Sequence, residues 1–133
     1  MEAPIGVLLS DDMIFTSRIA GTARDLGLTL KPLRSMDGIL QDARKRPPTC
    51  VIVDLANPTL NVPQLISQLS KSCATMPYVV AYGSHVDAAG LRAAREAGCN
   101  LVLPRSKFVE ELPRELAVWF GATASPRSPE CGP

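Results

Sequence analysis

Three aspartates follow two short apolar segments of the chain and could form one acidic site. Asp11 and Asp12 come after residues 5–9 and Ser10, and Asp54 follows residues 50–53. Both segments are rich in branched side chains and lack polar alternation, which is typical of strands buried on both faces. Carboxylates at the ends of two such strands can meet in one crevice, where three of them suit a divalent cation or chemistry on phosphate.

A simpler explanation exists for part of this pattern. Asp11 and Asp12 could begin a helix, because acidic side chains are favoured at helix N-termini. That explains one aspartate well and two less well, and it leaves Asp54 as an unusual, unpaired end of a buried strand. We therefore expect a shared acidic pocket. The single histidine, His85, lies in a segment of helix-capping residues without an obvious carboxylate partner, so we expect it on the surface.

The elements that would position these aspartates alternate along the chain. Apolar segments of strand type are followed by segments with helical spacing, and Gly and Pro residues separate them. Strands are expected at residues 5–9, 28–30, 50–54, 78–82 and 101–103. Helices are expected from Asp12 to Gly27, from Ser35 as N-cap to Ala43, from near Pro63 to Leu69, from Ser84 as N-cap to Gly98, and from Ser106 as N-cap to Trp119.

Five strand–helix pairs predict an α/β fold with one parallel sheet and helices on both faces. The strand order 2-1-3-4-5, as in flavodoxin-like three-layer folds, reverses its winding between strands 1 and 3. Ligands in such sheets bind beyond the carboxyl ends of the strands at that reversal. Asp11, Asp12 and Asp54 would lie there.

Length and composition limit the alternatives. We expect one domain over residues 1–120 of the 133, followed by a disordered tail over 121–133, which is rich in Gly, Pro and Ser. The net charge of +1 gives no reason to expect nucleic acid or an acidic membrane as partner. No apolar segment is long enough to span a bilayer, and the N-terminus lacks signal-peptide features, so we expect a cytoplasmic protein. The four cysteines have no metal or redox spacing.

Three details together resemble the receiver domain of bacterial response regulators over about residues 5–120. An acidic pair, Asp11 and Asp12, follows the first strand. Asp54 ends the third strand, with Pro58 four residues later, and an Ala-Gly step at Gly98 precedes the fifth strand. The resemblance implies that Asp54 is the phosphoacceptor. It also implies that Mg²⁺ is held by the three aspartates and by the backbone carbonyl of Ala56.

Several positions depart from the family pattern where a phosphorylated receiver senses its phosphoryl group. Arg105 occupies the place of a lysine that contacts the phosphoryl oxygens, and a forked guanidinium does not replace an ammonium neutrally. Lys107 could substitute only if its loop turned it inward. Tyr82 stands where the family has Ser or Thr, Val102 replaces the aromatic switch residue, and Asn61 begins the replacement of an Asp-Gly pair.

The resemblance implies a stand-alone signalling module of a two-component phosphorelay. Its protein partner would be a histidine kinase or a separate output protein, and a dimer could form through the fourth helix, fifth strand and fifth helix. The alternative is a pseudo-receiver that is not phosphorylated and serves as a constitutive protein-interaction module. A Mg²⁺-dependent phosphatase on the same scaffold is a further alternative, although the chain has no segment for a lid. We expect no enzyme activity beyond self-phosphorylation and autodephosphorylation at Asp54.

Overall fold

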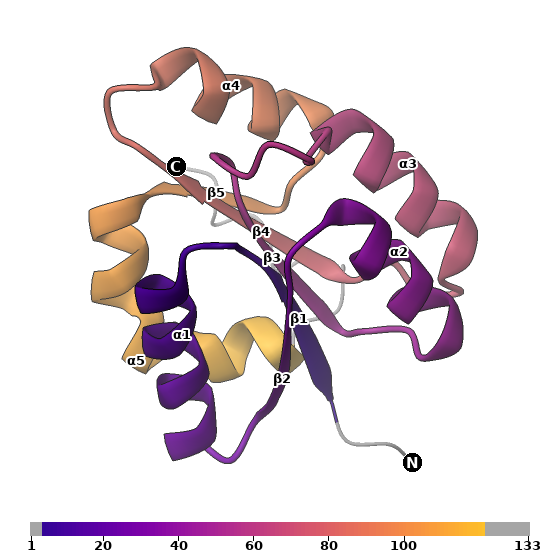
Figure 1. Ribbon diagram of the computed structural model, residues 1–133, viewed down its shortest axis with the longest axis horizontal. Helices are drawn as coiled ribbons and strands as arrows, with labels where there is room; N and C mark the ends of the chain where they lie inside the picture. Colours follow the sequence, from indigo (N-terminus) through magenta and orange to yellow (C-terminus); the bar gives the residue numbers. More distant parts are fainter. Residues whose placement is uncertain (1–3, 122–133) are drawn as a thin grey trace.

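The computed structural model describes residues 4–121, in which five strands and five helices alternate (Figure 1). The strands are β1 (Ile5–Leu9), β2 (Thr29–Leu33), β3 (Cys50–Asp54), β4 (Tyr78–Gly83) and β5 (Leu101–Pro104). The helices are α1 (Met13–Asp25), α2 (Met36–Lys45), α3 (Val62–Ser72), α4 (Ala88–Ala97) and α5 (Arg105–Gly121). All strand pairs are parallel, and the order is β2-β1-β3-β4-β5, which confirms the predicted α/β fold.

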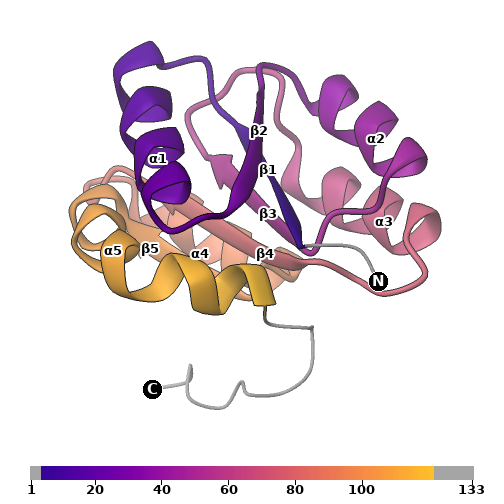
Figure 2. The same ribbon diagram turned by 90° about the horizontal axis from the view of Figure 1, so that it is seen from below.

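The sheet lies between two layers of helices. Figures 1 and 2 show α1 and α5 on one face of the sheet and α2, α3 and α4 on the other. Each face has its own apolar core, because successive side chains of a strand point to opposite faces. In β3, Val51 and Val53 join the core under α2–α4, whereas Cys50 and Ile52 join the core under α1 and α5. The strands are apolar throughout because both of their faces are buried.

The register brings the carboxyl ends of β1, β3 and β4 to one edge. Leu9 lies opposite Val53, and Asp54 lies opposite Tyr82. Asp54 continues the alternation of Cys50 and Ile52, and Tyr82 continues that of Val80, so both lie on the α1/α5 face. The edge predicted to hold the functional site is therefore formed by these strand ends.

Strand β2 is longer than the sequence predicts. The expected strand stopped before Pro32, whereas β2 runs from Thr29 to Leu33 with Pro32 opposite Leu8. Strand β2 is at the edge of the sheet and pairs only with β1, so an outward-facing backbone nitrogen without a hydrogen is tolerated there.

Two helix starts also differ from the prediction. Helix α4 is capped by Asp87, whose side chain accepts from the N–H of Gly90, and not by Ser84. The Ser84 hydroxyl instead accepts from the N–H of Val86 within the preceding turn. Helix α5 begins at Arg105, directly after β5, so Ser106 is its second residue and not its cap.

The end of α5 approaches the first strand unusually closely. The Phe120 ring lies on Gly6, the second residue of β1, and a Cβ atom at Gly6 would overlap that ring. Trp119 is 2% exposed and packs in the same core, as predicted. Helix α5 ends at Gly121, one residue beyond the predicted domain boundary, and the predicted disordered tail otherwise lies outside the described residues. Within residues 4–121, no helix combines the length and hydropathy needed to cross a membrane.

Candidate functional site at the carboxyl edge of the sheet

Asp54 is a buried carboxylate at the carboxyl end of the central strand β3. It is 4% exposed, and its Oδ1 atom accepts from the backbone N–H of Ala56 at 2.9 Å. The same oxygen lies 3.6 Å from Nη2 of Arg105, the first residue of α5. Two elements remote in sequence therefore meet at this carboxylate.

Asp11 and Asp12 lie on the same edge but are exposed. The Asp12 carboxylate is the N-cap of α1 and accepts from the N–H of Phe15 at 3.0 Å. The N–H of Asp12 donates to the Ser10 hydroxyl at 3.1 Å. Helix capping thus accounts for Asp12, as the simpler explanation predicted, whereas Asp54 is held by other groups.

Several charges act on the Asp54 carboxylate. Burial raises the pKa of Asp54 above its ordinary value, while the Ala56 N–H and the Arg105 guanidinium lower it. The charges of Asp11 and Asp12 add to the rise. The three aspartates therefore lie along one edge of the sheet, with Asp54 at its buried end.

The arrangement of these acids does not form a metal centre as it stands. Carboxylate and carbonyl oxygens are the donor types that Mg²⁺ prefers. Within the described residues, however, no three His, Cys, Asp or Glu side chains are grouped so that they could hold an ion. The Asp12 carboxylate is turned to the start of α1, and that of Asp54 faces Arg105. The donor types suit the ion, whereas their present directions do not.

Arg105 covers the acidic edge from the side of α5. Its guanidinium carbon lies 5.5 Å from the centroid of the Phe15 ring and 5.8 Å from that of Tyr82, which are cation–π distances. Lys107 points elsewhere and lies 4.0 Å and 3.7 Å from carboxylate oxygens of Glu110 and Glu111. Arg105, which stands in the position of the family's lysine, is therefore the cation that meets Asp54.

Tyr82 fills the space beside Asp54 with a buried aromatic ring. The ring lies 4.5 Å from that of Phe108 and 5.0 Å from that of Phe15, centroid to centroid. Its hydroxyl is fully enclosed and has no hydrogen-bond partner in geometric range among residues 4–121. Burial, and then the Asp54 charge, raise the pKa of this hydroxyl. The Ser10 side chain acts in the opposite direction and lowers this pKa, as a weak hydrogen bond would, although the two groups are not placed for a full hydrogen bond.

Sequence reasoning missed two contributors to this site. Ser10 is 3% exposed at the end of β1, and Phe15 forms part of the aromatic surface under Arg105. The position of Ser10, a single hydroxyl between an apolar strand and two aspartates, was a usable signal. The helical spacing of the sequence places Phe15 on an apolar helix face, and nothing in that spacing marks its contact with Arg105.

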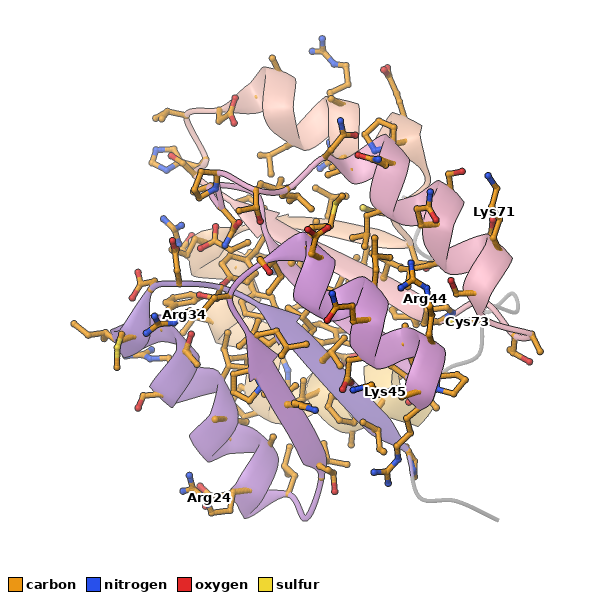
Figure 3. All side chains as sticks on the ribbon, turned by 45° about the vertical axis from the view of Figure 1, so that its right-hand side comes forward. Arg24, Arg34, Arg44, Lys45, Lys71 and Cys73 are labelled. Atoms are coloured by element: carbon orange, nitrogen blue, oxygen red, sulfur yellow. The ribbon has the colours of Figure 1, made fainter. Side chains whose placement is uncertain are left out.

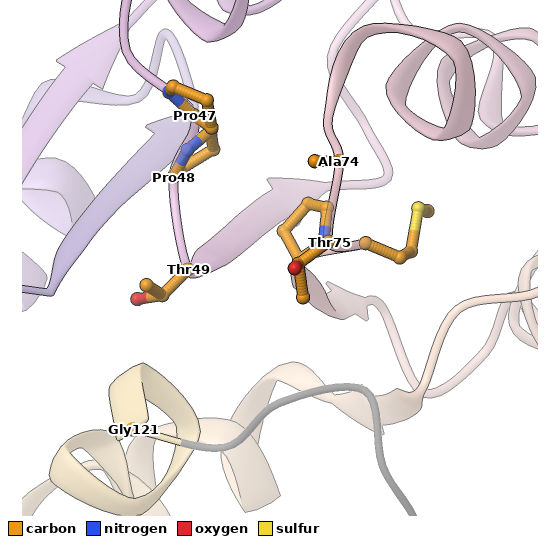
Figure 4. Close-up of a pocket in the computed structure, with 8 residues that line it drawn as sticks. Pro47, Pro48, Thr49, Ala74, Thr75 and Gly121 are labelled. Carbon is orange, nitrogen blue, oxygen red and sulfur yellow. The ribbon is translucent and has the colours of Figure 1, made fainter.

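A separate hollow lies at the opposite edge of the sheet. It has a volume of about 250 Å³ and lies between the segments that precede β3 and β4 and the end of α5 at Gly121 (Figure 4). Its lining is proline, threonine, alanine, glycine and methionine, without an ionisable side chain. It therefore offers no acid, base or charged ligand, and the Asp54 edge remains the place for chemistry.

Comparisons with known proteins agree with the geometry. A response regulator from Hahella chejuensis has a TM-score of 0.78 and 16% identity over 93% of this chain and 100% of its own. The receiver domain of a sensor histidine kinase from Pseudomonas aeruginosa has a TM-score of 0.74 and 18% identity over 91% and 100%. The receiver domain of NtrX from Brucella abortus has a TM-score of 0.72 and 19% identity over 87% and 97%.

This chain has the receiver-domain fold. The structural likeness covers nearly the whole of it and includes the predicted strand order. No family model matches the sequence, and no curated protein matches it. The Pseudomonas receiver domain is described with a magnesium ion coordinated in its active-site cleft. In the receiver-like domain described here, Asp54 is the residue at the end of the third strand, where the sequence placed the candidate phosphoacceptor.

Proposed function

We propose that this receiver-like domain is a signalling module that acts by binding a protein partner, with Asp54 as its candidate phosphoacceptor. The observation that carries the proposal is the buried Asp54 carboxylate at the carboxyl end of β3, with a cation supplied by α5. In an open parallel sheet this edge is the usual place for a ligand. The partner would be a histidine kinase or a separate output protein of a two-component phosphorelay.

Phosphorylation at Asp54 would be a simple transfer. A carboxylate oxygen would attack phosphorus, the bond from phosphorus to the donor's leaving group would break, and an acyl phosphate would form. Arg105 would then contact the phosphoryl oxygens in place of Asp54 Oδ1. Mg²⁺ would be held by Asp11, Asp12, Asp54 and the carbonyl of Ala56, and it would offset the repulsion between the two anionic groups. One oxygen of each of two carboxylates is engaged, that of Asp12 by the N–H of Phe15 and that of Asp54 by Ala56 and Arg105, so the second oxygen or a reoriented side chain would have to serve the ion.

A second candidate is a pseudo-receiver that binds its partner without phosphorylation. The Asp54–Arg105 contact and the bulk of Tyr82 favour it, because both occupy the space beside the carboxylate that a phosphoryl group would need. In that case the ion pair would be a permanent structural link between β3 and α5. A Mg²⁺-dependent phosphatase is not favoured by any contact of the described residues.

Labelling with acetyl phosphate separates the two candidates. The protein is incubated with acetyl phosphate and Mg²⁺, and its intact mass is measured. A phosphoreceiver gains one phosphoryl group, Asp54→Asn gains none, and Asp25→Asn, altered at the far end of α1, gains the same mass as the wild type. Absence of any label under forcing conditions, together with no response of the amides near Asp54 to beryllium trifluoride in NMR spectra, would leave the pseudo-receiver.

The oligomeric state belongs to the same proposal. A dimer could form through α4, β5 and α5, since the α4 side chains of Arg92, Arg95 and Glu96 are exposed there. Sedimentation velocity before and after acetyl phosphate treatment tests this. A mass of one chain under both conditions at high protein concentration would exclude dimerisation as the output.

A further inference from the structure

An open groove lies beside Arg105 on the outer side of the acidic edge. It has a volume of about 530 Å³ and is lined by the start of α1, the segment between β4 and α4, and the first turn of α5. Ile14 and Arg18 come from α1, Ser84 and His85 from the segment after β4, and Arg105 and Val109 from α5. Three elements that are distant in sequence therefore converge on one hollow.

The ionisable lining of this groove is entirely basic. It consists of Arg18, His85 and Arg105, and no acidic side chain lines the groove. Within residues 4–121 the Arg18 guanidinium has no ion pair or side-chain hydrogen bond. Arg105 meets one acid, Asp54, at 3.6 Å. The groove thus presents one unpaired cation and a second cation that is loosely paired.

Apolar surface accompanies these cations. Phe15 and Val109 line the groove together with Ile14, which is 82% exposed. Val86, next to the groove residue His85, is 77% exposed. Covering such exposed apolar side chains lowers the free energy, by about 25 cal/mol for each Å² of apolar surface removed from water. A ligand that fits would therefore combine negative charge with apolar side chains.

The other basic residues do not form a hollow that is both purely basic and lined by more than one cation. Figure 3 shows Arg44 and Lys45 on α2, Lys71 on α3 and Arg24 at the far end of α1. Arg24 lines another hollow, of about 460 Å³, together with Ala20, Ala23 and residues 27–30. Arg24 is the single ionisable residue in that lining. A third hollow, of about 270 Å³, is lined by Arg34 and Met13 but also by Asp11, so its charge is mixed. Of these three hollows, the groove beside Arg105 is the one that brings several basic side chains together without an acid.

We propose that this groove binds an acidic segment of a partner protein, in which carboxylates alternate with apolar side chains. A carboxylate of the segment pairs with Arg18, a second one competes with Asp54 for Arg105, and the apolar side chains cover Ile14 and Phe15. The inference rests on the proposed role as a partner-binding module and names the surface and the chemistry of the partner. Because the Arg105 guanidinium would pair with either the bound segment or Asp54, binding in the groove is then coupled to the charge of Asp54.

Titration with a synthetic peptide tests this surface. The probe is a hexapeptide of alternating glutamate and leucine with blocked termini, added to the full ¹⁵N-labelled chain at low ionic strength. We expect saturable amide shifts at Arg18, His85 and Arg105, and weaker binding in higher salt because charge pairs at a surface are screened. The same peptide with glutamine in place of glutamate should bind at least about tenfold more weakly, equivalent to about 1.4 kcal/mol.

Matched variants locate the effect. Arg18→Gln should weaken binding of the glutamate peptide about tenfold, whereas Arg24→Gln on the same helix should leave it unchanged. Asp54→Asn should tighten binding, because it removes the competitor for Arg105. Equal affinity for the two peptides, equal effects of the two arginine variants, or shifts centred on α2 and α3 would overturn the inference.

The outcome is distinguishable from that of the labelling experiment. If Asp54 is labelled and the peptide does not bind, the groove proposal fails and the receiver proposal stands. If the peptide binds in the groove and Asp54 is never labelled, the groove serves the pseudo-receiver.

Discussion

Tyr82 is a single residue whose two ends have opposite environments. Its ring is stacked on Phe108 and meets Phe15 at a tilt of 43°, while its hydroxyl is enclosed without a full hydrogen bond in the described residues. An unpaired buried hydroxyl weakens the folded state, because the group loses its hydrogen bonds to water and gains none. The ring therefore stabilises the domain, and the hydroxyl does not.

Tyr82→Phe should consequently keep or raise the free energy of unfolding, by up to about 1 kcal/mol. Tyr82→Ala should lower it by about 3–5 kcal/mol, since it leaves a cavity of ring size. Urea unfolding of the two variants and the wild type gives both differences. A clear loss in Tyr82→Phe would show that the hydroxyl has a stabilising partner.

The buried carboxylate of Asp54 makes stability depend on pH. The folded chain holds the Asp54 proton more tightly than the unfolded chain, because burial raises its pKa. The free energy of unfolding should therefore fall as pH rises from the ordinary aspartate range through the raised pKa of Asp54, and then level off. Asp54→Asn should remove this decline, so its advantage over the wild type grows with pH.

Arg105→Gln provides the companion measurement for that pH series. The Arg105 guanidinium is one of the groups that lower the pKa of Asp54, so its removal should extend the decline to higher pH. Urea unfolding across the acidic range checks both variants. Parallel curves for the wild type and Asp54→Asn would contradict the assignment of the decline to Asp54.

Among the elements, α1 depends on the same residue that the acidic edge would use. Asp12 caps the helix through its contact with the N–H of Phe15. Asp12→Ala should lower the free energy of unfolding by about 1 kcal/mol, whereas Asp12→Ser should retain most of it, because a hydroxyl also caps. If Asp12→Ser unfolds in urea like the wild type but is no longer labelled by acetyl phosphate, labelling requires the negative charge of Asp12 and not its capping of the helix. Equal unfolding of all three proteins would contradict the capping role.

The close packing of α5 on β1 supplies another test at this scale. An alanine in place of glycine normally favours a strand, yet at Gly6 its Cβ atom would overlap the Phe120 ring. We expect Gly6→Ala to lower the free energy of unfolding by about 1–3 kcal/mol. Phe120→Leu in the Gly6→Ala background should recover part of that loss, which a double-mutant cycle of urea unfolding measures. Strict additivity would show that the two residues do not compete for space.

The elements were predictable because their signals are local. Short apolar segments, helical spacing and Gly or Pro breaks are properties of neighbouring residues, and they were sufficient for all five strand–helix pairs. The incorrect predictions lie where the position of a strand in the sheet, or the path of the chain before a helix, decides the outcome. Pro32 is tolerated because β2 is an edge strand, and Asp87 rather than Ser84 caps α4 because the chain makes a turn first. Neither fact is visible in a short window.

The site was predictable only to the level of which residues share an edge. The predicted strand order placed Asp54 at the same edge as Asp11 and Asp12, and the family resemblance gave Arg105 the place of a lysine that contacts phosphate. The direction of each carboxylate depends on competing partners, such as the α1 N-terminus for Asp12. Three-dimensional packing decides which partner each carboxylate contacts. The sequence therefore could not distinguish a cluster of metal ligands from an Asp54–Arg105 ion pair and a separate helix cap at Asp12.

At the scale of the whole molecule, two apolar cores share one sheet and should unfold together. Every central strand contributes to both cores, so neither can be lost while the other remains. We expect the urea transitions followed by Trp119 fluorescence, which reports the α1/α5 core, and by far-ultraviolet circular dichroism to coincide. Different midpoints for the two signals would indicate that the layers separate.

The aromatic residues of the α1/α5 layer form a row from the far end of α5 to the acidic edge. Trp119 lies 5.6 Å from Phe108, Phe108 lies 4.5 Å from Tyr82, and Arg105 lies over Tyr82 (centroid distances between the rings). Trp119 is the one tryptophan of the chain. The protein thus carries an intrinsic fluorophore that is linked to the Asp54 edge by successive ring contacts, so we expect a change of charge at Asp54 to alter the Trp119 emission without any attached dye.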